Sequence, residues 1–194
     1  MREGFRFVSS VFDWISSLYR LPERVRYPNQ LHLTFQMQTQ KWSNWCWAAT
    51  ASSISQYYDC EDYVSQDEIV GRALGLPPPW VPEESWNRED TMLTGLRIVG
   101  CDNSTYPGSA ELRQAMQQLD RRNPVCVQIK WPSEGGHAVV IHGCWLDENG
   151  EDHYLIGDPC FDHSFPVPGS ELRNDYLEYG GRWVQTYHVR APEK

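Results

Sequence analysis

The sequence predicts an α+β domain, with helices in the first half of the chain and an antiparallel sheet in the second. Two features predict this layout. Before residue 123, apolar residues recur at helical spacing behind helix-capping residues. After residue 125, short runs rich in β-branched and aromatic residues are separated by turn sequences. Helices and strands are therefore segregated along the chain, which is typical of α+β proteins.

The first predicted helix contains the stretch WCWAATASSISQYY. Ser43 or Asn44 is the expected N-cap, because short polar side chains accept hydrogen bonds from the free N–H groups of a first turn. Trp47, Ile54 and Tyr58 belong to an apolar stripe at helical spacing. Alanines make the helix slim, so neighbouring elements can approach it closely and it can lie in the middle of the domain.

Three more helices are predicted further along the chain. One begins at a capping-box pattern formed by Ser65 and Glu68 and closes at Gly75. The last is expected to be capped by Ser109 and ended by Pro124. The expected ranges are 65–75, 89–98 and 109–123.

Five strands are predicted from alternating or continuous apolar runs. Their expected ranges are 31–37, 125–131, 137–146, 153–159 and 182–189. The sequence DENGED is typical of a hairpin turn, so the strands on either side of it are expected to pair antiparallel.

The chain is expected to comprise an N-terminal extension, residues 1–30, and one domain, residues 31–194. Val8, Phe12 and Ile15 fall at helical spacing, which predicts a short amphipathic helix docked on the domain. A propeptide-like or targeting segment is the alternative. Because Asp13 interrupts the apolar run and no small-residue cleavage site follows, a cleavable signal peptide is not expected. The predicted location is cytoplasmic, or outside the cell by a route without such a peptide.

Composition narrows the possible partners. The formal net charge of -9 disfavours nucleic acid, and no run of about 18 apolar residues predicts a membrane span. Nine tryptophans and ten tyrosines supply buried area or line a groove for an extended peptide. No C-x-x-C pair occurs among the six cysteines, which disfavours a zinc ribbon. Free thiols are favoured over a disulfide set, although two bridges plus one free cysteine remain compatible with the count.

Cys46 is the candidate nucleophile, because it falls in the first turn of the first predicted helix. The partial positive charge at a helix N-terminus stabilises a thiolate, which is the nucleophilic form of cysteine. The alternative is a buried cysteine that packs as a small apolar side chain. Trp47 shields the thiol from water or belongs to the core.

A cysteine nucleophile requires an imidazole, and His137 is the favoured one of six histidines. It opens an apolar strand after Gly136, where a substrate can approach the backbone closely. His142 lies an odd number of residues away, on the opposite sheet face, and is expected to be structural. The hairpin brings Asp158 close to His137, where it can orient the imidazole. Asp162 is the alternative carboxylate.

Gln40 precedes Cys46 by six positions and can supply a side-chain donor to an oxyanion, beside the backbone N–H of Cys46. Gln38 is the alternative donor. The proline-rich loop PPPWVPEESW carries Trp80 and Trp86, which are expected to flank the substrate and select an apolar side chain.

The combination of Gln40, Cys46-Trp47, His137 after a glycine pair and Asp158 on the next strand resembles the papain-like cysteine proteases. The sequences NWCWAA, PVCVQIKW, GGHAVVIHG and LIGDP are most similar to the compact bacterial family that includes plant-pathogen effector proteases. The likeness extends from about Leu33 to Val189. It implies a papain-like fold, Cys46 as nucleophile, His137 as general base and acid, Asp158 as its orienting group and Gln40 in the oxyanion hole.

One departure concerns the spacing between Cys46 and His137, which is 91 positions rather than the roughly 130–150 of papain-type enzymes. Trimmed substrate subsites are therefore expected. The predicted function is hydrolysis of a protein or peptide substrate, without metal or other cofactor. An acyltransferase, deamidase or transglutaminase-like enzyme would use the same three residues, and a non-enzymatic peptide-binding module would need none of them.

Overall fold

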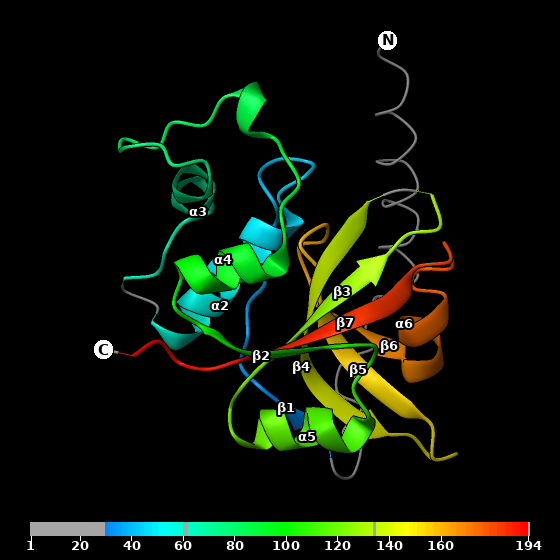
Figure 1. Cartoon of the computed structure of the whole chain (residues 1–194). Helices are drawn as coiled ribbons and strands as arrows, with labels where there is room; N and C mark the ends of the chain where they lie inside the picture. The colour runs from blue at the N-terminus through cyan, green and yellow to red at the C-terminus, as the bar shows by residue number, and fades with distance from the viewer. Residues whose placement is uncertain (1–29, 60–61, 134, 194) are drawn as a thin grey trace.

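The helices of residues 46–98 gather in one half of the molecule, and the strands, together with the helices of residues 112–120 and 169–174, make up the other half (Figure 1). The fold therefore mixes helices with an antiparallel sheet, as the α+β prediction requires. The computed structural model describes residues 30–59, 62–133 and 135–193. The predicted helix of the N-terminal extension lies outside the described residues. The helices are α2 (Cys46–Tyr58), α3 (Gln66–Ala73), α4 (Met92–Ile98), α5 (Leu112–Asp120) and α6 (Gly169–Asn174), with a 3₁₀ turn at Glu84–Trp86. The strands are β1 (Leu31–His32), β2 (Asp102–Pro107), β3 (Val125–Lys130), β4 (Gly136–Leu146), β5 (Asp152–Gly157), β6 (Phe165–Pro168) and β7 (Arg182–Val189).

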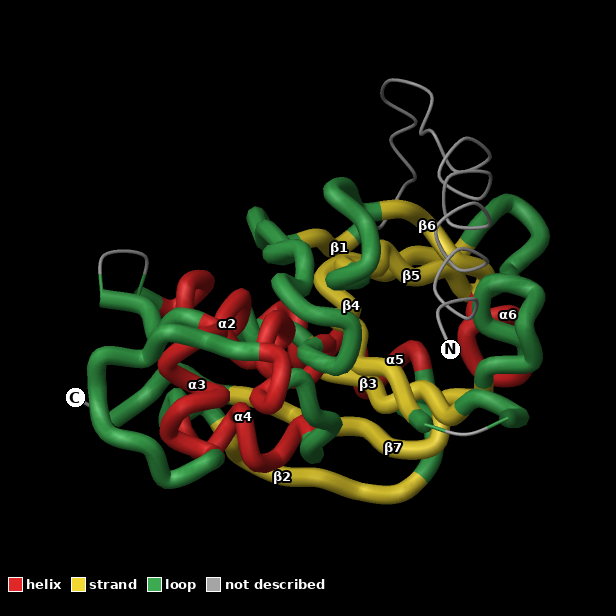
Figure 2. The backbone as a smooth tube through the Cα atoms, turned by 90° about the horizontal axis from the view of Figure 1, so that it is seen from above, coloured by secondary structure: helices red, strands yellow, loops and turns green. Residues whose placement is uncertain are grey.

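The strands form one antiparallel sheet in the order β2-β7-β3-β4-β5-β6, and β1 pairs with β4. Figure 2 shows the sheet bending so that α5 and α6 lie on its inner side, while α2, α3 and α4 gather on its outer side. The predicted hairpin between β4 and β5 is confirmed, with Gly157 opposite Val140. This register brings the residues after β5 back toward the start of β4.

Strands β3 and β4 are buried on both faces, which explains their nearly continuous apolar sequences. Each face contributes to a different core. The sheet core, on the inner side, includes Val127, Ile129, Val139, Ile141, Phe165 and Tyr176. The helix core, on the outer side, includes Trp45, Trp47, Ala51, Leu96, Ala138 and Val140.

Three predicted element boundaries are wrong, because polar side chains and backbone groups near them make contacts with other parts of the chain. The N-cap of α2 is Trp45, since the Ser43 hydroxyl and the Asn44 amide hydrogen-bond with Asn87 instead. The N-cap of α5 is Glu111 rather than Ser109. Glu111 forms a capping box with Gln114, whose side chain accepts its N–H at 2.8 Å.

The strand predicted at 31–37 is the third wrong boundary, because only Leu31–His32 is a strand. After Leu33, whose N–H still donates to the His142 carbonyl of β4, the backbone leaves the sheet for other partners. The N–H of Gln38 donates to Ser53 Oγ on α2 at 2.9 Å, and the N–H of Gln40 donates to the Pro159 carbonyl at 2.8 Å. The segment before α2 is therefore attached to both α2 and the loop after β5.

The ends of α3 confirm the sequence prediction. The Ser65 side chain accepts the N–H of Glu68, and Gly75 adopts a φ of +70° just after the helix. Strands β2 and β6 and helix α6 were not predicted. Among the described residues, none of the helices combines the length and hydropathy needed to cross a bilayer.

The slim face of α2 allows α4 to pack closely against it. A β-carbon added at Gly95 of α4 would lie 2.8 Å from Ala51 Cβ and 3.2 Å from the Trp47 carbonyl oxygen. Both neighbours belong to the rigid middle of the helix core. Gly95 is therefore required by the helix–helix contact.

We expect Gly95→Ala to lower the free energy of unfolding by about 1–3 kcal/mol, because an added methyl group overpacks the contact. In an unconstrained helix the same change would stabilise by up to about 1 kcal/mol. Urea unfolding measures the difference, with the exposed Arg97→Ala on the same helix as control. A stabilised Gly95→Ala protein would contradict the proposed contact.

Candidate active site

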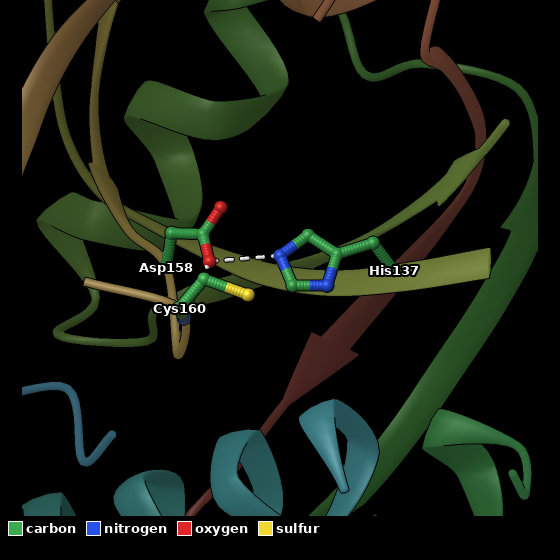
Figure 3. A group of neighbouring side chains, drawn as sticks. All are labelled: His137, Asp158 and Cys160. Carbon is green, nitrogen blue, oxygen red and sulfur yellow. Dashed lines mark hydrogen bonds and ion pairs between the residues drawn. The ribbon is translucent and has the colours of Figure 1, made fainter. Parts of the chain in front are cut away.

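His137 and Asp158 form a buried pair, in which His137 Nε2 lies 2.8 Å from Asp158 Oδ1 (Figure 3). The β4–β5 hairpin produces this contact. His137 is the second residue of β4 and faces Ile129 of β3, while β5 ends opposite Val140. Asp158 follows directly, so the turn sequence DENGED is sufficient to bring the two side chains together.

The Asp158 carboxylate is wholly buried and has three hydrogen-bond partners. Besides His137, Oδ1 accepts the N–H of Cys160 at 2.8 Å, and Oδ2 accepts the hydroxyl of Tyr176 at 2.8 Å. A buried carboxylate requires such partners to offset its lost hydration. The alternative carboxylate, Asp162, has a 91% exposed side chain and pairs with His163. Asp158 is therefore the carboxylate that the fold places beside His137.

The His137 ring lies between its partners and an aromatic wall. Trp131 stacks on it with ring centroids 6.1 Å apart, and Trp131 also contacts Tyr176. Burial disfavours the imidazolium, but the charge of Asp158 and then of a Cys160 thiolate outweigh burial and raise the pKa of His137 well above its usual value. The structure therefore favours a protonated His137.

His142 occupies the structural role predicted for it. Its Nε2 lies 2.8 Å from Ser164 Oγ, its Nδ1 lies 3.4 Å from the Leu33 carbonyl oxygen, and its ring packs against Phe35. Burial lowers the pKa of His142 to about 4. It is thus a neutral, hydrogen-bonded core histidine at neutral pH.

Cys46 is the first residue of α2 and is half-buried. As the first helical residue, its N–H has no partner within the helix. Thr50, one turn later, donates its hydroxyl to the Ala138 carbonyl at 3.3 Å. Residues one turn apart share a helix face, so Cys46 lies on the side of α2 that meets the strand residue next to His137.

Cys160 is a second thiol at this site, and the sequence analysis did not identify it. The thiol lies 3.6 Å from Gln40 Oε1 and interacts electrostatically with both His137 and Cys46. Burial raises its pKa, the imidazolium of His137 opposes the rise, and the charges of Asp158 and Cys46 add to it. Its position two residues after Asp158 was the feature of the sequence that could have identified Cys160 as a site residue. The five cysteines among the described residues are all free.

The side chain of Gln40 lies between the loop before α2 and Cys160. Its amide nitrogen donates to the carbonyls of Trp42 at 3.0 Å and Ser43 at 2.8 Å, and its oxygen faces Cys160. The alternative, Gln38, hydrogen-bonds with residues in the body of α2 and with α3. Of the two glutamines, Gln40 is the one that the fold places beside the Cys160 thiol.

The predicted substrate-binding tryptophans are held by hydrogen bonds and packing. Trp47 is 3% exposed and donates its indole N–H to the Arg88 carbonyl, while the Trp86 carbonyl accepts the indole N–H of Trp45. Trp80 instead packs against Gly71 of α3 and donates to the Leu76 carbonyl. The structure thus brings Trp86 to the Cys46 end of α2 and places Trp80 against α3.

Residues 28–164 match the protein family described as papain-like cysteine protease AvrRpt2. The chain belongs to this family. This confirms the resemblance seen in the sequence, and the chain is accordingly a papain-like cysteine protease that acts on protein substrates. Tyr176 lies beyond the matched segment, so the contact that completes the Asp158 environment comes from outside it. None of the curated proteins compared with the protease matches it.

Solved structures of plant cysteine proteases resemble the protease at a distance. Bromelain from Ananas comosus, in complex with the E64 inhibitor, has 12% identity and a TM-score of 0.42, covering 86% of this chain and 100% of bromelain. The ragweed pollen allergen Amb a 11, in its proform, has 14% identity and a TM-score of 0.47, covering 86% of this chain and 66% of that one. The family assignment depends on the family match alone.

We expect Tyr176→Phe to lower the free energy of unfolding by about 1–3 kcal/mol, because Asp158 Oδ2 would be left buried without its donor. The pH profile of cleavage should shift as well, because the charge of the Asp158 carboxylate raises the pKa of His137. Urea unfolding and a pH–rate profile measure the two effects, with Tyr179→Phe as an exposed control. An unchanged profile in a destabilised Tyr176→Phe protein would mean that the tyrosine has only a packing role.

The raised pKa of His137 predicts a pH-dependent stability. The folded chain binds this proton more tightly than the unfolded chain, whose histidine pKa is about 6.5. The stabilisation is therefore fully present below about pH 6.5 and is lost as pH rises through the folded pKa. The difference in free energy of unfolding between wild type and Asp158→Asn should therefore fall as pH rises above about 6.5.

Urea unfolding across this range measures the effect. Asp162→Asn, at an exposed histidine pair, is the control and should change stability little at any pH. A difference for Asp158→Asn that stays constant or grows with pH would contradict the raised His137 pKa.

Proposed function

We propose that the protease hydrolyses peptide bonds through a Cys46–His137–Asp158 triad and an acyl-enzyme intermediate. The observation that supports this most is the 2.8 Å hydrogen bond between His137 Nε2 and Asp158 Oδ1. This bond occupies one ring nitrogen and leaves Nδ1 to exchange a proton with Cys46. The Thr50–Ala138 contact supports the required nearness of Cys46 to the start of β4.

In the first half of the reaction, the Cys46 thiolate, whose proton is held by His137, attacks the substrate carbonyl carbon. The carbonyl oxygen gains negative charge, and the unpartnered N–H of Cys46 at the start of α2 is suited to stabilise it. The tetrahedral intermediate then collapses to a thioester. The amine leaves with the proton held by His137.

In the second half, His137 removes a proton from water, and the water oxygen attacks the thioester carbon. The C–S bond then breaks, the acid product is released, and the proton held by His137 restores the starting Cys46–His137 pair. Gln40 is proposed as the second oxyanion donor. Its amide nitrogen donates to two loop carbonyls in the free protease. To donate to the oxyanion, the Gln40 amide must therefore give up one of these hydrogen bonds, such as that to the Ser43 carbonyl, and form one to the substrate oxygen.

The proposed substrate path runs between the loop after Trp86 and the turn before His137. A β-carbon added at Gly135 would lie 3.0 Å from Glu89 Oε1, so these two segments approach one another closely. Gly136 next to it also has no room for a side chain, because Gln128 packs against it. We propose that Gly136, Trp86 and the edge of Trp47 border the substrate, and that Trp80 acts from its position on α3 by holding the proline-rich loop.

We expect Cys46→Ala to reduce cleavage of a peptide library by at least about 10⁴-fold, because removal of a nucleophile abolishes acyl-enzyme formation. Labelling by a thiol-directed peptidyl electrophile should be lost too. Mass spectrometry of the products distinguishes hydrolysis from loss of ammonia or gain of an amine. Loss of ammonia would show that the reaction is deamidation, and gain of an amine would show acyl transfer. Either product would contradict the proposed peptide-bond hydrolysis.

The matched control is Cys144→Ala, which removes a thiol from the sheet core. It should retain cleavage in proportion to its folded fraction. Cleavage that is unaffected in the Cys46→Ala protein would rule out Cys46 as nucleophile.

A further inference from the structure

Three side chains with metal-binding atoms converge beside the proposed nucleophile. A ring nitrogen of His137, a carboxylate oxygen of Asp158 and the sulfur of Cys160 all lie within 4.8 Å of one another (Figure 3). Figure 3 shows the Asp158 and Cys160 side chains extending from the loop after β5 toward the His137 ring. A Cys-His-Asp triad accounts for His137 and Asp158 but leaves the Cys160 thiol without a function.

We propose that His137, Asp158 and Cys160 form an inhibitory binding site for a divalent cation of the zinc class. The claim that cation binding stops cleavage rests on the proposed function, because the cation would occupy the imidazole that activates Cys46. The binding itself requires only the three side chains. The fourth coordination position would be open to water or to the Cys46 thiolate.

The donor set matches zinc in chemistry and geometry. Thiolate, imidazole and carboxylate are the usual zinc ligands, at about 2.3, 2.0–2.1 and 2.0–2.2 Å respectively. In a tetrahedral site these bond lengths separate the donor atoms by roughly 3.2–3.8 Å. The observed separations range from 2.8 Å for Nε2 and Oδ1 to at most 4.8 Å. Small side-chain shifts are therefore enough to close the site around an ion.

The surroundings of the three ligands fix their positions. The Tyr176 hydroxyl holds Asp158 Oδ2, the N–H of Cys160 holds Oδ1, and Trp131 packs on the His137 ring. Such outer partners orient metal ligands and strengthen binding. The pair of His163 and Asp162, whose carboxylate is exposed, is not part of this three-residue cluster and offers a contrast.

A cation here would compete with protons. The ion replaces the proton shared between His137 and Asp158 and the proton on the Cys160 sulfur, and both are released to solvent. Binding should therefore strengthen as pH rises. Burial raises the pKa of the Cys160 thiol, and a bound cation would oppose this effect by stabilising the thiolate.

The test uses the Cys46→Ala protein, in which the nucleophile is absent. Co²⁺ serves as a spectroscopic probe and Zn²⁺ as a competitor. We expect one Co²⁺ per chain, tetrahedral absorption bands, a thiolate-to-cobalt charge-transfer band and displacement by Zn²⁺. Adding Cys160→Ser should remove the charge-transfer band and weaken binding by at least about 10-fold.

Two matched variants in the same background check the location. His163→Gln removes a half-buried histidine outside the cluster, and Cys144→Ala removes a core thiol, so both should keep the affinity and the band. His137→Gln should lose both, and circular dichroism verifies that each variant is folded. Unchanged cobalt binding in the Cys46→Ala/Cys160→Ser protein would overturn the site. Because binding is read without Cys46, this result is independent of whether Cys46→Ala abolishes cleavage.

Discussion

The burial of the Asp158 carboxylate is the constraint on which the site depends. A carboxylate removed from water must find donors within the protein, and this one finds them on three segments. His137 comes from β4, the N–H of Cys160 from the loop after β5, and the Tyr176 hydroxyl from the segment after α6. The same bonds that satisfy the charge therefore fix the ring of His137, close the end of the hairpin and attach the C-terminal part of the sheet.

The position of the site follows from the way one sheet serves two cores. Ala138 and Val140 of β4 face the helix core, while Val139 and Ile141 face the sheet core. Cys46 packs at the edge of the first core and Cys160 at the edge of the second. The groups of the proposed triad are thus located where the two cores adjoin, and the alanine face of α2 allows the helix to pack close to the sheet.

The sequence was sufficient for the local features of the site and insufficient for those that depend on distant contacts. Hairpin register predicted the His137–Asp158 pair, because strand pairing and a turn signal act over few residues. The N-cap of α2 was mispredicted because Asn87, a loop residue, engages the polar side chains before the helix. Tyr176 was missed for the same reason, since only the folded chain brings its hydroxyl to Asp158.

The presence of a second thiol changes how the His137 environment is understood. Asp158 Oδ1 accepts from both the His137 ring and the N–H of Cys160, so the hydrogen bond that orients the imidazole also positions the Cys160 backbone. The two thiols differ in their surroundings. Cys46 is the first residue of α2, whereas Cys160 lies beside Asp158, and burial above all raises the pKa of its thiol. The imidazolium of His137 opposes that rise, so Cys160 is the thiol whose protonation would respond to a further positive charge in the cluster.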